Sequence, residues 1–130
     1  MATIEHLAVW TPDLERARTF YERFFDAQPG TRYVNEKTEF TSYFLTFASG
    51  ARLELMHKPT ILGESQTPGT ESFGYAHLAF SVGSEQRVDE LTERLRQSGC
   101  VVASEPRRTG DGYYESVVRD PDGNSVEITV

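Results

Sequence analysis

The chain of 130 residues carries one pattern twice, and this duplication limits its possible folds more than any other feature. A strand-like alternation of apolar residues at 4–10 is matched at 76–82, and helical spacing of apolar residues follows each. Further along the two copies, residues 52–56 correspond to residues 125–129. Each copy therefore predicts the order strand, helix and three further strands, which together make an α+β fold.

The first copy has signals for the start and end of its helix. Thr11 is predicted as the N-cap and Pro12 as the first helical position, ahead of an apolar stripe that ends at Phe25. The Gln-Pro-Gly sequence at 28–30 is predicted to end the helix. Strands are expected around residues 32–35, 43–47 and 52–56.

The second copy repeats this organisation. Ser84 is predicted to cap a helix that Gly99 stops, with a buried stripe formed by Val88, Leu91 and Leu95. Strands are expected around residues 101–104, 113–118 and 124–130, with a turn at 120–123.

The duplication also predicts the domain organisation. We expect a single domain made of module 1 at about 1–57, a linker at about 58–74 and module 2 at about 75–130. The linker contains Pro, Gly and Ser/Thr residues without sustained periodicity. Its length is unusual for a structureless connection in a small domain, which favours a functional or interface role.

Histidine and glutamate recur at matching positions of the two copies. His6 and His77 are 71 residues apart, and Glu54 and Glu127 are 73 residues apart. Strand alternation places all four on the face opposite the aliphatic side chains that would pack under the helices. Imidazoles and carboxylates are ligands of catalytic divalent metals, and a metal would compensate buried carboxylates. A structural histidine or a solvated glutamate explains one such residue more simply, but that explanation would have to hold four times.

Charge and composition exclude several classes of function. The net charge of −7 disfavours nucleic acid and an anionic membrane surface as partners. No apolar run reaches the roughly 18 residues of a spanning helix, and the first residues do not have the layout of a signal peptide. The single cysteine, Cys100, cannot form an internal disulfide and is expected to be a small core residue. These features predict a cytoplasmic protein.

At the repeated histidines and glutamates the chain resembles the vicinal oxygen chelate superfamily. This superfamily includes glyoxalase I, bleomycin-resistance proteins, fosfomycin-modifying thiol transferases and extradiol dioxygenases. The resemblance covers essentially the whole chain and includes the strand ending in His6, the helix opening at 13–21, the strand at 74–80 and the segment 120–127. It implies two βαβββ modules in tandem, with curved mixed sheets that carry their helices on the convex side. It also implies a homodimer in which the sheets surround a metal and a small-molecule substrate.

The ligand set resembles that of glyoxalase I, which uses His, Glu, His and Glu at the positions of His6, Glu54, His77 and Glu127. The resemblance implies one divalent metal per site, Zn, Ni, Co or Mn, and a lyase or isomerase similar to lactoylglutathione lyase. Such an enzyme transfers a proton next to a carbonyl through a metal-stabilised enediolate. The substrate would be an α-hydroxy carbonyl or a hemithioacetal. Glu127 or Glu54 would be the catalytic base, with Glu127 slightly favoured.

The chain departs from bacterial glyoxalase I where that enzyme holds glutathione. Trp10 and Lys58 stand at the positions of the usual Arg and Asn, so a different substrate is expected. The other candidate substrate-binding residues are Phe44, Met56, Tyr113 and Arg107, the last on a loop together with Arg108. Core packing of the apolar candidates and a solvated charged loop are the simpler alternatives.

Two other functions on the same fold remain alternatives. One is a metal-dependent thiol transferase that modifies a small antibiotic, and the other is a non-enzymatic resistance protein that binds a hydrophobic drug. Full occupancy of the His and Glu positions favours the glyoxalase-like enzyme over both. The sequence leaves open whether the four residues meet within one chain or across a dimer.

Overall fold

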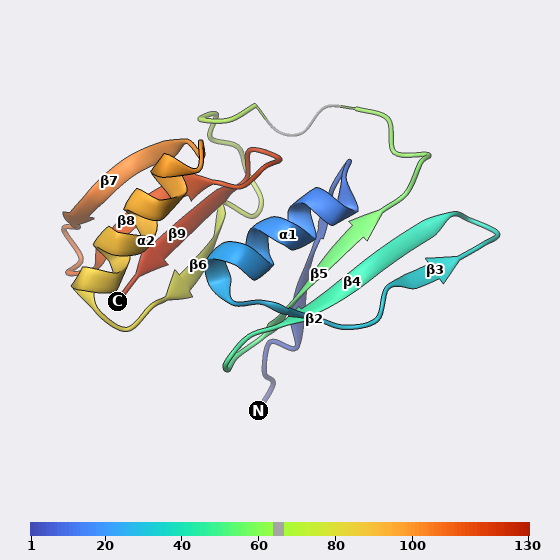
Figure 1. Cartoon of the computed structure of the whole chain (residues 1–130), viewed down its shortest axis with the longest axis horizontal. Coiled ribbons are helices and arrows are strands. Elements are labelled where there is room, and N and C mark those ends of the chain that lie inside the picture. The colour runs from blue at the N-terminus through green and yellow to red at the C-terminus, as the bar shows by residue number, and fades with distance from the viewer. Residues whose placement is uncertain (64–66) are drawn as a thin grey trace. The chain divides into compact units, whose positions relative to one another are not determined.

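The computed structural model describes residues 1–63 and 67–130 of the chain. The chain splits into two compact units, Met1–Ser65 and Gln66–Val130, and each contains one helix and one mixed sheet (Figure 1). The boundary falls inside the linker predicted at 58–74, of which positions 64–66 lie outside the described residues. Within the described ranges, no helix is long and apolar enough to cross a membrane.

The first unit contains β1 (His6–Trp10), α1 (Leu14–Phe25), β2 (Gln28–Pro29), β3 (Tyr33–Asn35), β4 (Phe40–Thr46) and β5 (Arg52–His57). Its sheet has the strand order β1-β5-β4-β2, and β3 also pairs with β4. β1 and β5 run parallel, whereas the other pairs are antiparallel. Helix α1 lies on one face of this sheet, against β4 and β5 (Figure 1).

The second unit contains β6 (His77–Ser81), α2 (Glu85–Gln97), β7 (Val102–Arg108), β8 (Tyr114–Arg119) and β9 (Ser125–Thr129). Its strand order is β6-β9-β8-β7, with β6 parallel to β9 and the other pairs antiparallel. Helix α2 packs on this sheet as α1 packs on the first. The predicted α+β fold of two tandem βαβββ modules is therefore confirmed.

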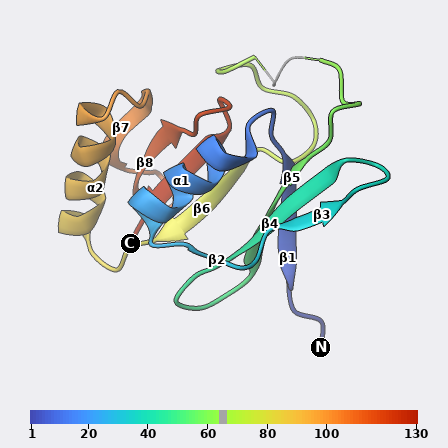
Figure 2. The same ribbon diagram turned by 45° about the vertical axis from the view of Figure 1, so that its right-hand side comes forward.

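The two parallel strand pairs share one register, as expected for a duplicated unit. His6 is the strand partner of Arg52, and Figure 2 shows β1 beside β5. In the second unit His77 is the strand partner of Ser125, so each histidine lies opposite the residue two positions before a glutamate. This common register places one histidine and one glutamate on the same face of each sheet.

The helix-covered face of each sheet forms the core of its unit. The fully or almost fully buried side chains of this face are Leu45, Leu53, Leu55, Val118, Val126 and Ile128. The burial of Leu53, Leu55, Val126 and Ile128 confirms the aliphatic face predicted from strand alternation. The His and Glu residues lie on the other face, which no helix of the same unit covers.

The two helices bury different kinds of side chain. α1 buries four aromatic rings, Phe20, Tyr21, Phe24 and Phe25, whose neighbouring centroids are 5.0 to 6.0 Å apart. α2 buries the predicted aliphatic stripe together with Thr92. The first unit is therefore packed around aromatic rings, and the second around smaller side chains.

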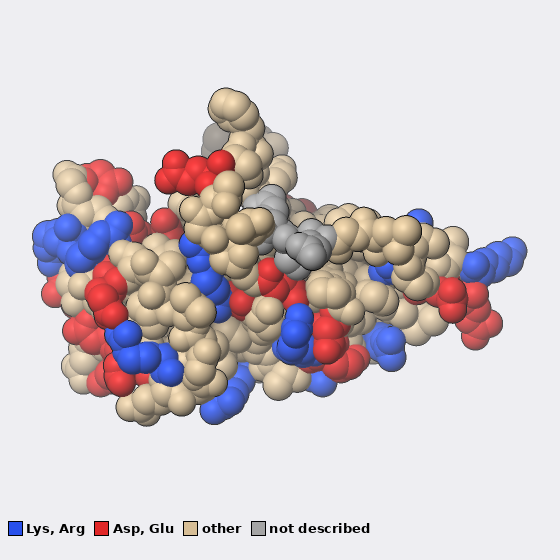
Figure 3. Space-filling view, turned by 90° about the horizontal axis from the view of Figure 1, so that it is seen from above, with Lys and Arg blue, Asp and Glu red and all other residues tan. Residues whose placement is uncertain are grey.

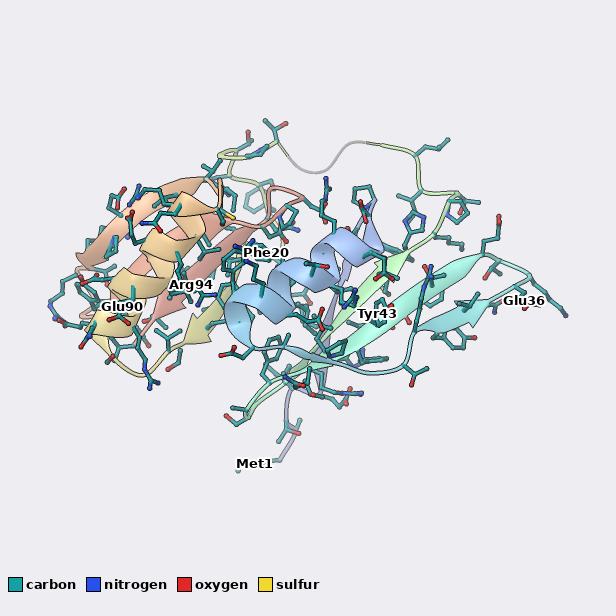
Figure 4. The ribbon with its side chains drawn as sticks, viewed as in Figure 1. Met1, Phe20, Glu36, Tyr43, Glu90 and Arg94 are labelled. Carbon is teal, nitrogen blue, oxygen red and sulfur yellow. The ribbon has the colours of Figure 1, made fainter. Side chains whose placement is uncertain are left out.

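Tyr43 of β4 and Ser116 of β8 occupy equivalent positions in the two sheets, but they contact the helices through different hydrogen bonds. Tyr43 of β4, labelled in Figure 4, reaches α1, where its hydroxyl donates a hydrogen bond to Glu15 Oε1 at 2.9 Å. At the corresponding position of β8, the hydroxyl of buried Ser116 lies 2.7 Å from that of Thr92 in α2. The Thr92 hydroxyl also donates to the carbonyl of Val88, at 2.6 Å.

The start and end of α1 differ from the sequence prediction. Asp13 rather than Thr11 is the N-cap, because its carboxylate accepts the backbone N–H of Arg16 at 2.9 Å, and Pro12 lies outside the helix. Thr11 is buried and its hydroxyl accepts the N–H of Asp13 instead. The helix ends at Phe25, with Asp26 in the left-handed region at φ 53°, and the predicted stop at 28–30 contributes strand β2.

The elements of the second unit follow the prediction more closely. Ser84 caps α2 by accepting the N–H of Arg87, and Gly99 follows the helix with a φ of 92°. The exception is β7, which runs to Arg108 rather than ending at residue 104. Arg107 and Arg108 therefore belong to a strand paired with β8, and their assignment to a loop is wrong.

Acidic and basic side chains are mixed on the surface. Figure 3 shows Lys and Arg next to Asp and Glu over the face in view. Arg96, for example, donates to both Glu93 and Glu105, at 3.0 and 2.6 Å. These are exposed pairs, and pairs of this kind contribute little to stability.

Candidate metal-binding site

His6 and Glu54 form a pair on the open face of the first sheet. His6 begins β1, and Glu54 is at the middle of β5, where its strand partners are Ala8 and Phe44. The distance from His6 Nε2 to Glu54 Oε1 is 3.8 Å. The Glu54 side chain is 14% exposed and that of His6 is 40% exposed, so the carboxylate is sheltered while the imidazole remains reachable.

The other side of the His6 ring is held by charged neighbours. Its Nδ1 hydrogen-bonds the carboxylate of Glu5, which also accepts two N–H groups of Arg52. These hydrogen bonds, first from His6 and then from Arg52, lower the pKa of Glu5. Because an ionised carboxylate can only accept, Nδ1 carries the proton and Nε2 is left as the nitrogen that faces Glu54.

His77 and Glu127 form the corresponding pair in the second unit. Glu127 lies on β9, opposite Ala79 of β6 and Val117 of β8. The distance from His77 Nε2 to Glu127 Oε2 is 3.2 Å, shorter than in the first unit. The exposed fractions, 43% for His77 and 19% for Glu127, are similar to those of the first pair.

The carboxyl group of Glu127 has an elevated pKa. Burial is the main cause, and the opposing effect of His77 does not cancel it. The neighbouring carboxylate of Glu115, on β8, raises the pKa further, while Arg107 lowers it. Glu127 therefore holds a proton more readily than an ordinary glutamate does, a property suited to a group that takes up a proton and returns it.

Each unit by itself provides two candidate metal ligands rather than a complete set. Among the described residues, no group of three or more His, Cys, Asp or Glu side chains is placed to hold a metal ion. The donor chemistry nevertheless fits a divalent metal: each pair presents an imidazole Nε2 and a carboxylate oxygen on an open sheet face.

Several predicted substrate-binding residues lie on the same face as the first pair. Phe44 meets His6 edge-on with ring centroids 5.3 Å apart. Trp10 is the strand partner of Met56, and its ring meets that of Phe40 at 90° with a centroid distance of 6.0 Å. Trp10 is 48% exposed, so it is not a core residue of its unit.

The remaining candidates lie at strand ends. Lys58 follows β5 and is partly buried, while Tyr113 precedes β8 and is exposed. Arg107 is the strand partner of Glu115, which places it near Glu127 in the second unit. The structure thus puts Phe44 beside His6 and Arg107 near Glu127.

Sequence reasoning missed Glu5, Arg52 and Glu115 as neighbours of the two pairs. Strand alternation assigns Glu5 to the face opposite His6, but Glu5 precedes β1 and is free of that alternation. Arg52 and Glu115 could have been found from the strand register, since each lies on a strand directly beside the relevant residue. His57, at the end of β5, is partly buried, and its Nδ1 donates to the carbonyl of Thr11 at 3.0 Å.

Comparison with known proteins gives consistent matches over nearly the whole chain. The family model described as the Glyoxalase/Bleomycin resistance protein/Dioxygenase superfamily matches residues 3–128. The uncharacterized protein PA2024 of Pseudomonas aeruginosa is 32% identical over 98% of this chain and 87% of its own length. The metallothiol transferase FosB of Lysinibacillus sphaericus is 26% identical over 97% of this chain and 80% of its own.

The fold also matches solved structures. The trypanothione-dependent glyoxalase I of Leishmania major superposes with a TM-score of 0.76 at 22% identity. The match covers 99% of this chain and 86% of that one. At this identity the likeness concerns the fold, and the chemistry has to be argued from the residues of this chain.

Proposed function

The chain belongs to the glyoxalase/bleomycin resistance protein/dioxygenase superfamily, and from that premise we propose that it is a metal-dependent, glyoxalase I-like lyase or isomerase. The superfamily includes enzymes, among them glyoxalase I and metallothiol transferases. The proposed reaction transfers a proton between two neighbouring carbon atoms of a small substrate, next to a carbonyl. The reaction type is that of lactoylglutathione lyase, but the thiol part of the substrate need not be glutathione.

The observation that carries this proposal is the repetition of one His–Glu pair in both units. The two pairs have the same strand register, and each glutamate is mostly buried next to an imidazole nitrogen. A structural role for one such pair would not require its repetition. Shared chemistry at a single site would require it.

His6, Glu54, His77 and Glu127 are the proposed ligands of one divalent metal, Zn, Ni, Co or Mn. When bound, the metal supplies Lewis acidity, which polarises substrate oxygens and stabilises negative charge that develops on them. The imidazoles are the fixed ligands. The glutamates are the ligands that can also exchange protons.

Glu127 is the proposed base. In the metal-free chain, burial raises the pKa of Glu127. When it moves off the metal, its carboxylate would take up the substrate proton and hold it between the two steps. In a hemithioacetal, it would remove the proton from the carbon that bears the hydroxyl and return it to the former carbonyl carbon. The hydroxyl proton moves to the former carbonyl oxygen, so the product is an isomeric hydroxy thioester. Glu54 is the alternative base.

The substrate is proposed to be an α-hydroxy carbonyl compound or a hemithioacetal. Trp10, Phe44, Met56 and Tyr113 would contact its apolar part, because the first three share the open face with His6 and Glu54. Lys58 and Arg107 would contact an anionic group. The two units are proposed to act as one glyoxalase-like domain within a homodimer.

A thiol transferase is the second candidate, and the FosB relatives favour it. Two metallothiol transferases, from Lysinibacillus sphaericus and Shouchella clausii, are 26% and 28% identical to the chain. Against this, the chain presents a carboxylate at Glu54 as well as at Glu127, a fuller set of ligands than the transferase activity normally uses.

Product analysis distinguishes the two candidates. The metal-loaded protein is incubated with methylglyoxal and each of several thiols, and separately with fosfomycin and the same thiols. Formation of a hydroxy thioester supports the proposed lyase. A fosfomycin–thiol adduct without thioester would replace it with the transferase, and the absence of both products with every thiol would reject either enzyme.

A further inference from the structure

We propose that Glu5 and Arg52 are positioning residues that fix the orientation of the His6 imidazole and so strengthen metal binding by the first His–Glu pair. The inference rests on the metal site of the proposed function and extends it to two residues outside the ligand set. It concerns the first unit alone, since all the contacts involved lie between β1, β4, β5 and the residue that precedes β1.

The contacts around His6 form a closed ring. The Glu5 carboxylate accepts from His6 Nδ1 with one oxygen and from Arg52 with the other, where the Arg52 Nε to Oε1 distance is 2.8 Å. The Arg52 guanidinium lies over Phe44, with Cζ 4.1 Å from the ring centroid. Phe44 in turn meets the His6 ring edge-on at 5.3 Å. Each side chain of the ring therefore contacts two others.

The backbone fixes the base of this ring. The backbone N–H of Arg52 donates to the carbonyl of Glu5, the residue that precedes β1, at 2.9 Å. Arg52 is also the strand partner of His6. Glu5 and Arg52 form an exposed ion pair, and their backbones hold its two ends beside His6.

The second unit lacks both residues. The residue before His77 is Ala76, and the strand partner of His77 is Ser125, so neither position can supply the same charged contacts. The shorter distance from His77 to Glu127 shows that a pair can form without them. In the first unit the distance from His6 Nε2 to Glu54 Oε1 is 3.8 Å, and Glu5 orients the imidazole through its other nitrogen, Nδ1.

The consequence for metal binding follows from the tautomer. With its proton held on Nδ1 by Glu5, the imidazole presents the Nε2 lone pair on the side of Glu54. A ligand that is already oriented loses less conformational freedom when the metal binds. Carboxylates that hydrogen-bond the far nitrogen of a metal-binding histidine typically change metal affinity or activity by about 10- to 100-fold.

The first test reads the tautomer of His6 in the metal-free protein by two-bond proton–nitrogen NMR. The chain has three histidines, and the signals are assigned with His57→Gln and His77→Gln variants. The proposal predicts that the Nδ1–H tautomer of His6 dominates in the natural protein and loses this dominance in Glu5→Ala. An unchanged tautomer in Glu5→Ala would overturn it. This readout does not depend on any activity.

The second test measures zinc affinity by competition with a chromophoric chelator. Glu5→Ala is expected to weaken binding by about tenfold, and Arg52→Ala by a smaller factor, because Arg52 acts through Glu5. The control is Glu105→Ala, which removes an equally exposed carboxylate paired with Arg96, and it should leave the affinity unchanged. Equal affinity of the Glu5→Ala and natural proteins would refute the proposal.

The two tests separate this inference from the proposed function. If the natural protein binds no zinc, the proposed metal site is wrong, while the NMR experiment still decides whether Glu5 orients His6. If the natural protein binds zinc and Glu5→Ala binds it equally well, the metal site stands and the positioning role does not. Glu5→Gln keeps a hydrogen-bond acceptor without the charge. Its Nδ1–H tautomer population and its zinc affinity should lie between those of the natural protein and those of Glu5→Ala.

Discussion

The two His–Glu pairs have the same backbone register but different neighbours. In the first unit the imidazole is the constrained member, since Glu5, Arg52 and Phe44 surround His6. In the second unit the carboxylate is the perturbed member, because burial and Glu115 raise the pKa of Glu127. The two units therefore share the positions of the candidate ligands and differ in the residues around them.

This difference indicates how a duplicated site can divide its work. A histidine that is fixed from behind is suited to holding a metal in place. A sheltered carboxylate with an elevated pKa is suited to exchanging a proton. We expect the first pair to contribute more to metal affinity and the second to contribute more to turnover. The following experiments compare equivalent positions of the two units.

The largest expected effects come from the two glutamates. Glu127→Gln should lower kcat by about 10²- to 10⁴-fold, the usual contribution of a general base, with metal still bound. Glu54→Gln should mainly weaken metal binding. Turnover and metal content of both variants are measured side by side. A Glu127→Gln protein with full activity would contradict the assigned base, and full activity in both variants would reject the mechanism.

Large effects on stability are expected from matched core residues. Leu55 and Ile128 each follow a site glutamate, and both are completely buried under a helix. Leu55→Ala and Ile128→Ala should each lower the free energy of unfolding by about 2–5 kcal/mol. Denaturant unfolding of both variants measures this. A loss confined to one variant would show that only one unit limits the stability of the chain.

Each unit contains a buried threonine, and replacing the two threonines by valine should change the free energy of unfolding in opposite directions. Thr92 in α2 bonds Ser116 and Val88, so Thr92→Val leaves the Ser116 hydroxyl without this partner and should cost about 1–3 kcal/mol. Thr41 in β4 is also buried, and its hydroxyl has no hydrogen-bond partner among the described residues. Thr41→Val should therefore be neutral or stabilising. Thermal unfolding of the two variants decides, and a Thr41→Val protein as destabilised as Thr92→Val would contradict this account.

The smallest effects are expected at the two helix N-caps. Asp13 and Ser84 accept the N–H of Arg16 and Arg87, at 2.9 and 3.2 Å. Asp13→Ala and Ser84→Ala should each destabilise the protein by about 1 kcal/mol. Thr11→Ser, which leaves the Asp13 cap in place, is the comparison variant for the start of α1. An Asp13→Ala protein as stable as the natural one would contradict the assignment of Asp13 as the cap.

The sequence predicted the fold because the duplication and the strand alternation are local signals. The elements of both modules, the aliphatic stripe of α2 and the caps at Ser84 and Gly99 all follow from spacing and residue type. The cap of α1 was misplaced because Thr11 and Asp13 are both good capping residues two positions apart. Arg107 was assigned to a loop because the nearby glycines at 110 and 112 are typical of loops, whereas β7 continues to Arg108.

The proximity of one histidine and one glutamate within each unit was also predictable, whereas the residues around each pair were not. The repeat identified His6, Glu54, His77 and Glu127, and the register of each sheet brings its own pair together. The ring of contacts around His6 requires that Glu5, which precedes β1, does not follow the alternation of that strand. The elevated pKa of Glu127 depends on burial and on a residue from a neighbouring strand. Such features arise from tertiary contacts and have no local signature.

The most direct test of the account is the metal content of the purified protein, measured by elemental analysis beside His6→Ala and His77→Ala. The account predicts about one divalent metal per chain in the natural protein and its loss in both variants, because one metal needs both pairs. Retention of the metal in either variant would show that a single pair suffices and would contradict the shared site. No metal in the natural protein, even after incubation with Zn²⁺, Ni²⁺ and Mn²⁺, would contradict the proposed enzyme.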